Sequence, residues 1–195
     1  MRLLTALALT GPALTACESD ETACTPVGAA GAAPSVVALV ENDTRGGLAD
    51  LTNGGEVHLW RPLQGGHVLY VGARVTGLCA DDVMITGRIK DLRTGTVISE
   101  ETRRGFQFID SGDGTATSDP QDLGAVANVA LCPEATETFN VMGTAFELEL
   151  RVEDIDGRVA RGSVTVTPVC AQSADADRRA CECECQLSSS VSGCG

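Results

Sequence analysis

The chain has 195 residues, of which 27 are Asp or Glu and 14 are Lys or Arg, so its formal net charge is −13. A chain this acidic does not attract the phosphate backbone of nucleic acids, and we therefore expect no nucleic-acid partner. The chain from residue 35 to residue 170 is long enough for one domain of ordinary size.

The N-terminal residues are typical of a targeting segment. Arg2 gives a short positively charged start, and the apolar run from Leu3 to Leu14 is too short to span a bilayer. The run ends in Leu14-Thr15-Ala16-Cys17. These residues resemble the signal peptide and lipobox of bacterial lipoproteins, in which a Leu, two small residues and a Cys mark the lipidation site. The alternative is an ordinary secretory signal peptide, with Cys17 as a disulfide cysteine.

The lipoprotein resemblance implies that residues 1–16 are removed and that Cys17 carries the lipid. Its thiol would hold a diacylglyceryl thioether, and its freed amine a further acyl chain such as palmitate. Two or more chains anchor a protein stably to a membrane without crossing it. In some bacteria an Asp after the lipidated cysteine retains the protein on the inner membrane. Because Glu18 occupies that position, we expect a cell-envelope protein on the outer membrane rather than the inner membrane.

Composition divides the remaining chain into three parts. Residues 17–34 are small and polar, which predicts a flexible tether that carries the lipid. Residues 35–170 are expected to form one folded domain, and residues 171–195 a cysteine-rich tail.

Seven segments of the folded part carry strand patterns. The clearest has Phe146, Leu148, Leu150 and Val152 alternating with charged residues, so that one face is apolar and the other is charged. Turn residues between neighbouring segments predict three hairpins, the first of which joins 56–61 to 67–76. The expected strands are 36–40, 56–61, 67–76, 83–91, 96–103, 146–153 and 158–167.

Short antiparallel strands with one polar face indicate two stacked sheets, and hence an all-β sandwich. The hairpin 148–168, with the run Val152-Glu153-Asp154-Ile155-Asp156-Gly157-Arg158, resembles the last two strands of bacterial extracellular immunoglobulin-like modules. That resemblance implies an antiparallel immunoglobulin-like sandwich of about seven strands. We predict no helix. Residues 122–131 are compatible with either a helix or a strand.

With Cys17 lipidated, an even number of cysteines remains, as a set of disulfide bonds in an exported protein requires. One economical arrangement pairs Cys79 with Cys132 and Cys185 with Cys194, and joins Cys24 and Cys170 to Cys181 and Cys183. It is one of 105 connectivities. The disulfide candidates are Cys24, Cys79, Cys132, Cys170, Cys181, Cys183, Cys185 and Cys194.

Two groups of residues also allow a metal site. Cys181, Cys183 and Cys185 alternate along the tail and, with Cys194, would offer four thiolates to Cu⁺ or Zn²⁺. The loop with Asp110 and Asp113, followed by Asp119 and Asp122, offers carboxylates to Ca²⁺, although loops rich in Gly and Asp are usually turns.

The sequence contains no recognisable catalytic motif, and its two histidines, His58 and His67, are expected to be structural or exposed. We therefore expect a protein that is not an enzyme. The favoured function is a lipid-anchored binding or structural module of the cell envelope, of unknown ligand, whose partner is an envelope protein or a polysaccharide. The alternative is a metal-binding or thiol-redox lipoprotein that acts through the cysteines of the tail.

Overall fold

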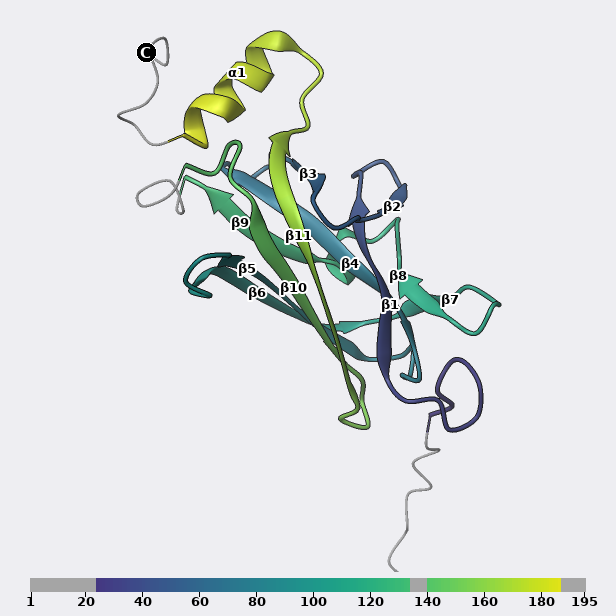
Figure 1. Ribbon diagram of the computed structural model, residues 1–195. Coiled ribbons are helices and arrows are strands. Elements are labelled where there is room, and N and C mark those ends of the chain that lie inside the picture. Colours follow the sequence, from purple (N-terminus) through teal and green to yellow (C-terminus); the bar gives the residue numbers. More distant parts are fainter. Residues whose placement is uncertain (1–23, 134–139, 187–195) are drawn as a thin grey trace, which may run out of the picture.

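The computed structural model describes residues 24–133 and 140–186, which form two stacked β-sheets with one helix at one end (Figure 1). Its elements are β1 (Ser35–Asn42), β2 (Leu48–Asp50), β3 (Gly55–Leu59), β4 (His67–Thr76), β5 (Val83–Asp91), β6 (Val97–Phe106), β7 (Phe108–Asp110), β8 (Ala116–Ser118), η1 (Leu123–Ala125), β9 (Ala127–Cys132), β10 (Phe146–Glu153), β11 (Val159–Cys170) and α1 (Asp175–Glu184).

The first sheet has the order β2-β1-β4-β8-β7, with β9 also paired to β4, and the second has the order β3-β11-β10-β5-β6. Every strand pair is antiparallel except β3 with β11. The prediction of an all-β fold with two stacked sheets is confirmed.

The core lies between the inner faces of the two sheets. On β10 the four apolar residues that alternate with charged residues are almost completely buried, as the sequence pattern predicts. Leu69, Val71 and Ala73 of β4 are buried in the same core from the facing sheet. At Gly87 of β5 the layers approach so closely that a Cβ would lie 2.7 Å from Val129 Cγ2 and 2.8 Å from Ala127 Cβ.

Two of the three predicted hairpins form, namely β5 with β6 and β10 with β11. The predicted hairpin between 56–61 and 67–76 is wrong. Only an isolated bridge between Trp60 and Val68 joins these segments, while β3 runs parallel to β11 in the other sheet. The side chains of Val57 and Leu59 on β3 are buried. They would point into the core from a strand in either sheet, so their alternation could not identify the partner strand.

The ambiguous segment 122–131 contains both a short helix and a strand. Asp122 caps η1 by accepting a hydrogen bond from the Gly124 amide at 2.7 Å. β9 follows and buries Ala127, Val129 and Leu131 in the core.

The two ends of the described chain lie at opposite ends of the sandwich (Figure 1). Residues 24–34 were predicted as part of a flexible tether, but they are attached to the fold. Val27 donates a hydrogen bond to the Leu78 carbonyl at 2.9 Å and accepts one from the Gly77 amide at 2.8 Å. The tether prediction is therefore too long at its C-terminal end.

The helix α1 was not predicted, because only Cys181 of its residues is buried and no apolar stripe marks it in the sequence. Asp175 and Asp177 lie in its first turn, where a negative charge is favourable, and Arg178 forms ion pairs with Asp175 and Glu182. Within 24–133 and 140–186, no helix has the length and apolar character needed to cross a membrane.

Candidate functional site

Disulfide bonds join both ends of the chain to the sandwich. At one end, Cys132 bonds to Cys185 and Cys170 bonds to Cys181, with Cα–Cα distances of 5.1 and 6.0 Å. These bridges attach α1 and the residue that follows it to the last residues of β9 and β11. At the other end, Cys24 bonds to Cys79, with a Cα–Cα distance of 5.9 Å. Cys183 is disulfide-bonded as well.

The predicted pairs Cys79–Cys132 and Cys185–Cys194 are wrong, and Cys24 bonds to Cys79 instead of to Cys181 or Cys183. Cys132 pairs with His67 at the start of β4, whereas Cys79 follows the end of that strand. A ten-residue strand separates its ends by about 30 Å, far more than a disulfide spans. The bond between Cys170 and Cys181 agrees with the arrangement that the sequence suggested. Cys17 and Cys194 lie outside the described residues.

The alternating cysteines of the tail do not converge in the way that an extended segment would allow. They lie on and just after α1, where Cys181 and Cys185 are one helical turn apart and face the sandwich, both completely buried. Each belongs to a different disulfide, so neither offers a thiolate in this state. The predicted four-thiolate site is therefore not available as the sequence presented it.

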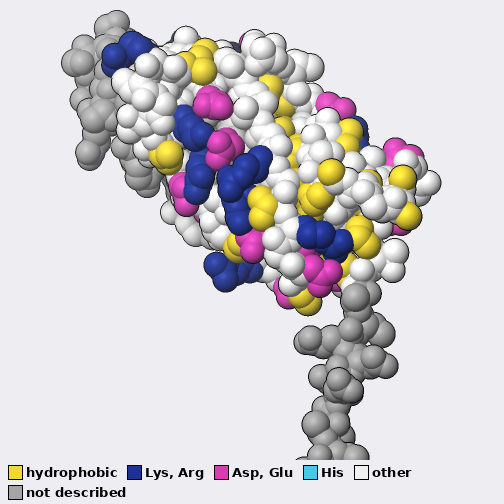
Figure 2. Space-filling model, turned by 60° about the horizontal axis from the view of Figure 1, so that its bottom comes forward, with side chains coloured by type: hydrophobic (Ala, Val, Ile, Leu, Met, Phe, Trp, Pro, Cys, Tyr) yellow, Lys and Arg dark blue, Asp and Glu magenta, His cyan; other side chains and the backbone are white. Residues whose placement is uncertain are grey.

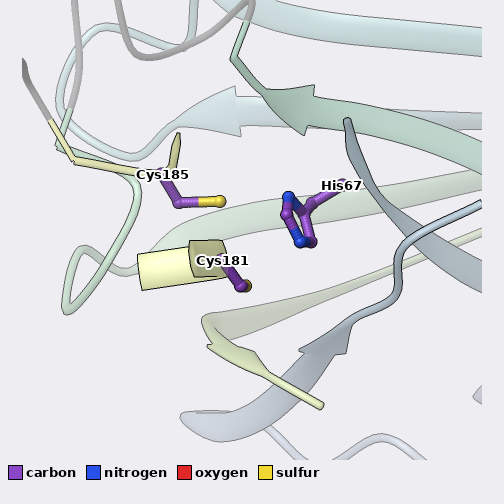
Figure 3. Close-up of side chains that lie close together, drawn as sticks. All are labelled: His67, Cys181 and Cys185. Atoms are coloured by element: carbon purple, nitrogen blue, oxygen red, sulfur yellow. The ribbon is translucent and has the colours of Figure 1, made fainter. Parts of the chain in front are cut away.

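His67 was not expected to belong to this cluster, yet its ring faces Cys181 and Cys185 (Figure 3). One of its nitrogens and the two sulfur atoms all lie within 4.8 Å of one another. The ring is 1% exposed, and burial lowers the pKa of His67, whereas the nearby Glu184 carboxylate raises it and Arg61 lowers it. Glu184 Oε2 lies 3.0 Å from Nδ1, within ion-pair distance, and no hydrogen bond satisfies this buried nitrogen.

His58 has a different environment. It lies on β3, its side chain is 46% exposed, and its Nδ1 is 2.9 Å from the buried Glu41 carboxylate. The same carboxylate accepts a hydrogen bond from the His58 amide at 2.6 Å. Glu41 thus fixes the ring at the surface, and the two histidines share no partner among the described residues.

A second group with metal-ligand atoms consists of Cys24, Cys79 and Asp154, whose ligand atoms lie within 4.8 Å of one another. The Asp154 carboxylate already accepts hydrogen bonds from the Cys79 amide at 2.9 Å and from Arg158 Nε at 2.8 Å. These bonds satisfy the buried carboxylate, which indicates a structural role at this end of the sandwich.

The acidic loop that suggested Ca²⁺ does not gather its carboxylates. Each caps its own turn: Asp110 accepts from the Gly112 amide, Asp113 from Thr115, Asp119 from Gln121 and Asp122 from Gly124. Among the residues that the structure describes, these four do not form a group of three ligand atoms within 4.8 Å. Their arrangement is that of successive Asx turns.

A hollow of about 290 Å³ lies where β6 of the second sheet meets the first sheet, and we call it the side pocket. Its apolar wall includes Leu63, which is fully exposed at the surface. The sequence did not indicate this pocket, because its residues come from five separate segments. They are Pro62, Leu63, Gln64, Tyr70, Arg103, Leu123, Gly124 and Asn128.

The polar wall of the side pocket is held by a hydrogen-bond network. Glu101 accepts from Arg103 Nε at 2.6 Å and from the Asn128 amide at 3.0 Å. The Asn128 side chain satisfies both of its groups when its oxygen accepts from Arg103 Nη2 at 2.8 Å and its nitrogen donates to the Val126 carbonyl at 3.2 Å. Glu101 neutralises Arg103, so the wall is polar without a strong net charge.

Burial raises the pKa of Tyr70, against a smaller opposing effect of Arg103, so its phenol remains protonated at neutral pH. Figure 2 shows one face on which acidic and basic side chains lie next to one another, with apolar side chains between them.

No protein-family model matches this chain, and a search of curated proteins finds no significant match.

Proposed function

We propose that the protein is a lipid-anchored binding module of the cell envelope that does not act as an enzyme. In this proposal Cys17 carries the lipid, and the sandwich presents the side pocket to an envelope protein or polysaccharide. The observation that carries the binding role is the side pocket, because its polar groups are held in place beside a fully exposed leucine.

The order of the strands supports an immunoglobulin-like form of the sandwich. One sheet places β1, β4 and β9 side by side, and the other has the order β11-β10-β5-β6. These orders match the A-B-E and G-F-C-C′ arrangements of immunoglobulin domains. Sandwiches of this kind commonly bind partners through surfaces that a rigid scaffold holds in position.

The chemistry of the side pocket favours a neutral ligand group. Gln64 and the protonated Tyr70 offer uncharged donors and acceptors, while Leu63 and Leu123 offer apolar surface. A volume of about 290 Å³ is close to the lower limit of small-molecule sites. It suits one sugar ring of a polysaccharide or one neutral side chain of a protein.

The substitution Leu63→Asp tests the binding role. It places a charge on the apolar rim, so we expect affinity to fall by about ten-fold or more, equivalent to about 1.4 kcal/mol. Binding of the purified protein is measured separately to isolated envelope polysaccharide and to detergent-solubilised envelope proteins. The fraction to which the wild type binds identifies the class of partner.

Leu92→Asp is the matched control. Leu92 is also an exposed leucine, but it lies in the turn between β5 and β6 and does not line the side pocket. We expect this variant to bind as the wild type does. Equal binding by Leu63→Asp and the wild type, or an equal loss in both variants, would refute the role of the side pocket.

A further inference from the structure

The end of the sandwich that holds α1 brings two disulfides and a histidine together. Cys181 and Cys185 belong to different bridges, are one helical turn apart, and approach the ring of His67 (Figure 3). All three residues are at most 1% exposed. The cluster is therefore buried and is held by three elements, namely β4, β9 and β11, in addition to α1.

The His67 ring has an unmet hydrogen-bonding capacity at this position. Its Nδ1 is buried and lacks a hydrogen-bond partner, although Glu184 Oε2 lies 3.0 Å away. Buried polar atoms without a partner are rare in folded proteins and require an explanation. A ligand that binds a nitrogen lone pair would provide one.

We propose that reduction of the Cys132–Cys185 and Cys170–Cys181 bonds converts this cluster into a zinc site, with Cys181, Cys185 and His67 as ligands. The site is independent of the side pocket and of the proposed binding role. It differs from the four-thiolate site expected from the sequence. His67 is a ligand here, whereas Cys183 and Cys194 are not.

The geometry suits a tetrahedral ion. Zinc binds sulfur at about 2.3 Å and imidazole nitrogen at about 2.0 Å, so its ligand atoms lie roughly 3.3–3.8 Å apart. The two sulfur atoms and the His67 nitrogen already lie within 4.8 Å of one another, so only small movements are needed. The fourth position is open to water or to one of the cysteines that the same reduction frees, Cys132 or Cys170.

The redox step requires an external dithiol. Each disulfide accepts two electrons and two protons from one dithiol, which becomes a cyclic disulfide, so opening both bridges consumes two dithiols. Each thiol that binds zinc then releases its proton to water, and the thiolate becomes the ligand. In the oxidised protein the sulfur atoms of Cys181 and Cys185 are bonded to those of Cys170 and Cys132 and are not thiolates, so we expect no zinc binding.

Cobalt binding to the full-length protein tests the site. The protein is reduced with a phosphine, because a dithiol would itself bind the metal, and Co²⁺ is added while the thiolate-to-cobalt absorption is recorded. All variants carry Cys24→Ser and Cys79→Ser, so that the second cysteine group cannot contribute. We expect the absorption in the reduced protein, its loss when Zn²⁺ is added, and none in the oxidised protein.

Two histidine variants decide whether the site is the one proposed. His67→Gln keeps a polar side chain of similar size. We expect it to weaken cobalt binding by at least about ten-fold, because even the loss of a residue that only hydrogen-bonds to a metal ligand lowers metal affinity that much. His58→Gln is the control and leaves affinity unchanged. No absorption in the reduced protein, or the same affinity for His67→Gln as for the parent, would overturn the proposal.

A further variant keeps the test decisive should His67→Gln fail to fold. Cys170→Ser with Cys181→Ser removes one bridge and one ligand together, and is expected to lower both the absorption and the affinity. An unchanged absorption in this variant would also overturn the assignment, because the thiolates would then come from elsewhere.

Discussion

Glu149 shows how single residues stabilise the outer face of the second sheet. It lies on β10 and forms ion pairs with Lys90 and Arg88 of the neighbouring strand β5. Arg88 in turn contacts Glu100 on β6, so alternating charges connect three strands. The hydrogen bond from Lys90 is the largest cause that lowers the pKa of Glu149, with further contributions from both cations and partial opposition from burial.

The lowered pKa predicts how stability depends on pH. A carboxylate whose folded-state pKa lies below its unfolded value stabilises the fold above the unfolded pKa, and this contribution disappears as the pH falls through the folded pKa. We expect Glu149→Gln to lose about 1 kcal/mol at pH 7, and the difference from the wild type to shrink as the pH falls below about 4.3. Urea unfolding at pH 7 and pH 3 measures both values.

Glu147→Gln is the control for this prediction. Glu147 lies on the same face two residues earlier and forms no ion pair among the described residues. Its substitution is expected to change stability little at either pH. A loss in Glu149→Gln that is the same at pH 7 and pH 3 would show that charge is not its cause.

At the scale of elements, the approach of β5 to β9 depends on Gly87. An added methyl group would lie 2.7 Å from Val129 Cγ2 and 2.8 Å from Ala127 Cβ, closer than packed carbon atoms normally come. We expect Gly87→Ala to destabilise the protein by about 1–3 kcal/mol, because the two sheets must separate locally. Urea unfolding measures this cost.

A double-mutant cycle with Val129→Ala identifies the cause. Removing the valine methyl groups creates space for the new side chain, so the cost of Gly87→Ala is expected to be smaller in that background. Equal costs in the two backgrounds would locate the effect in the backbone of β5 instead of in the contact between the layers.

Several elements could be predicted from the sequence because their patterns are local. β10 alternates strictly, and the turn before β11 contains Gly157, whose φ of 76° suits glycine. The parallel pairing of β3 with β11 could not be predicted, because the buried Val57 and Leu59 fit either sheet. The helix α1 escaped prediction since disulfides hold it to the sandwich in place of an apolar face.

The candidate sites were harder to predict than the strands. The cysteines were visible in the sequence, but nothing near position 67 indicates that its histidine lies beside Cys181 and Cys185. The side pocket is similarly hidden, because Gln64, Arg103 and Asn128 meet only when the sheets stack. Contacts between residues distant in the chain depend on strand order, which a single sequence pattern does not contain.

At the scale of the whole molecule, the disulfides determine how the proposed anchor would present the domain. Cys24 is bonded to Cys79 at the end of the sandwich opposite α1. Cys24 follows Cys17 by seven positions, and an extended chain of that length reaches at most about 25 Å. An anchor at Cys17 would therefore hold this end close to the membrane.

Mass spectrometry of the N-terminal peptide, from protein isolated with its membrane, tests the central claim most directly. We predict a peptide that begins at Cys17 and carries the added mass of a diacylglyceryl group and one further acyl chain. A mature chain that begins at another residue, or a Cys17 without lipid, would contradict the proposal that this protein is a lipid-anchored module of the cell envelope.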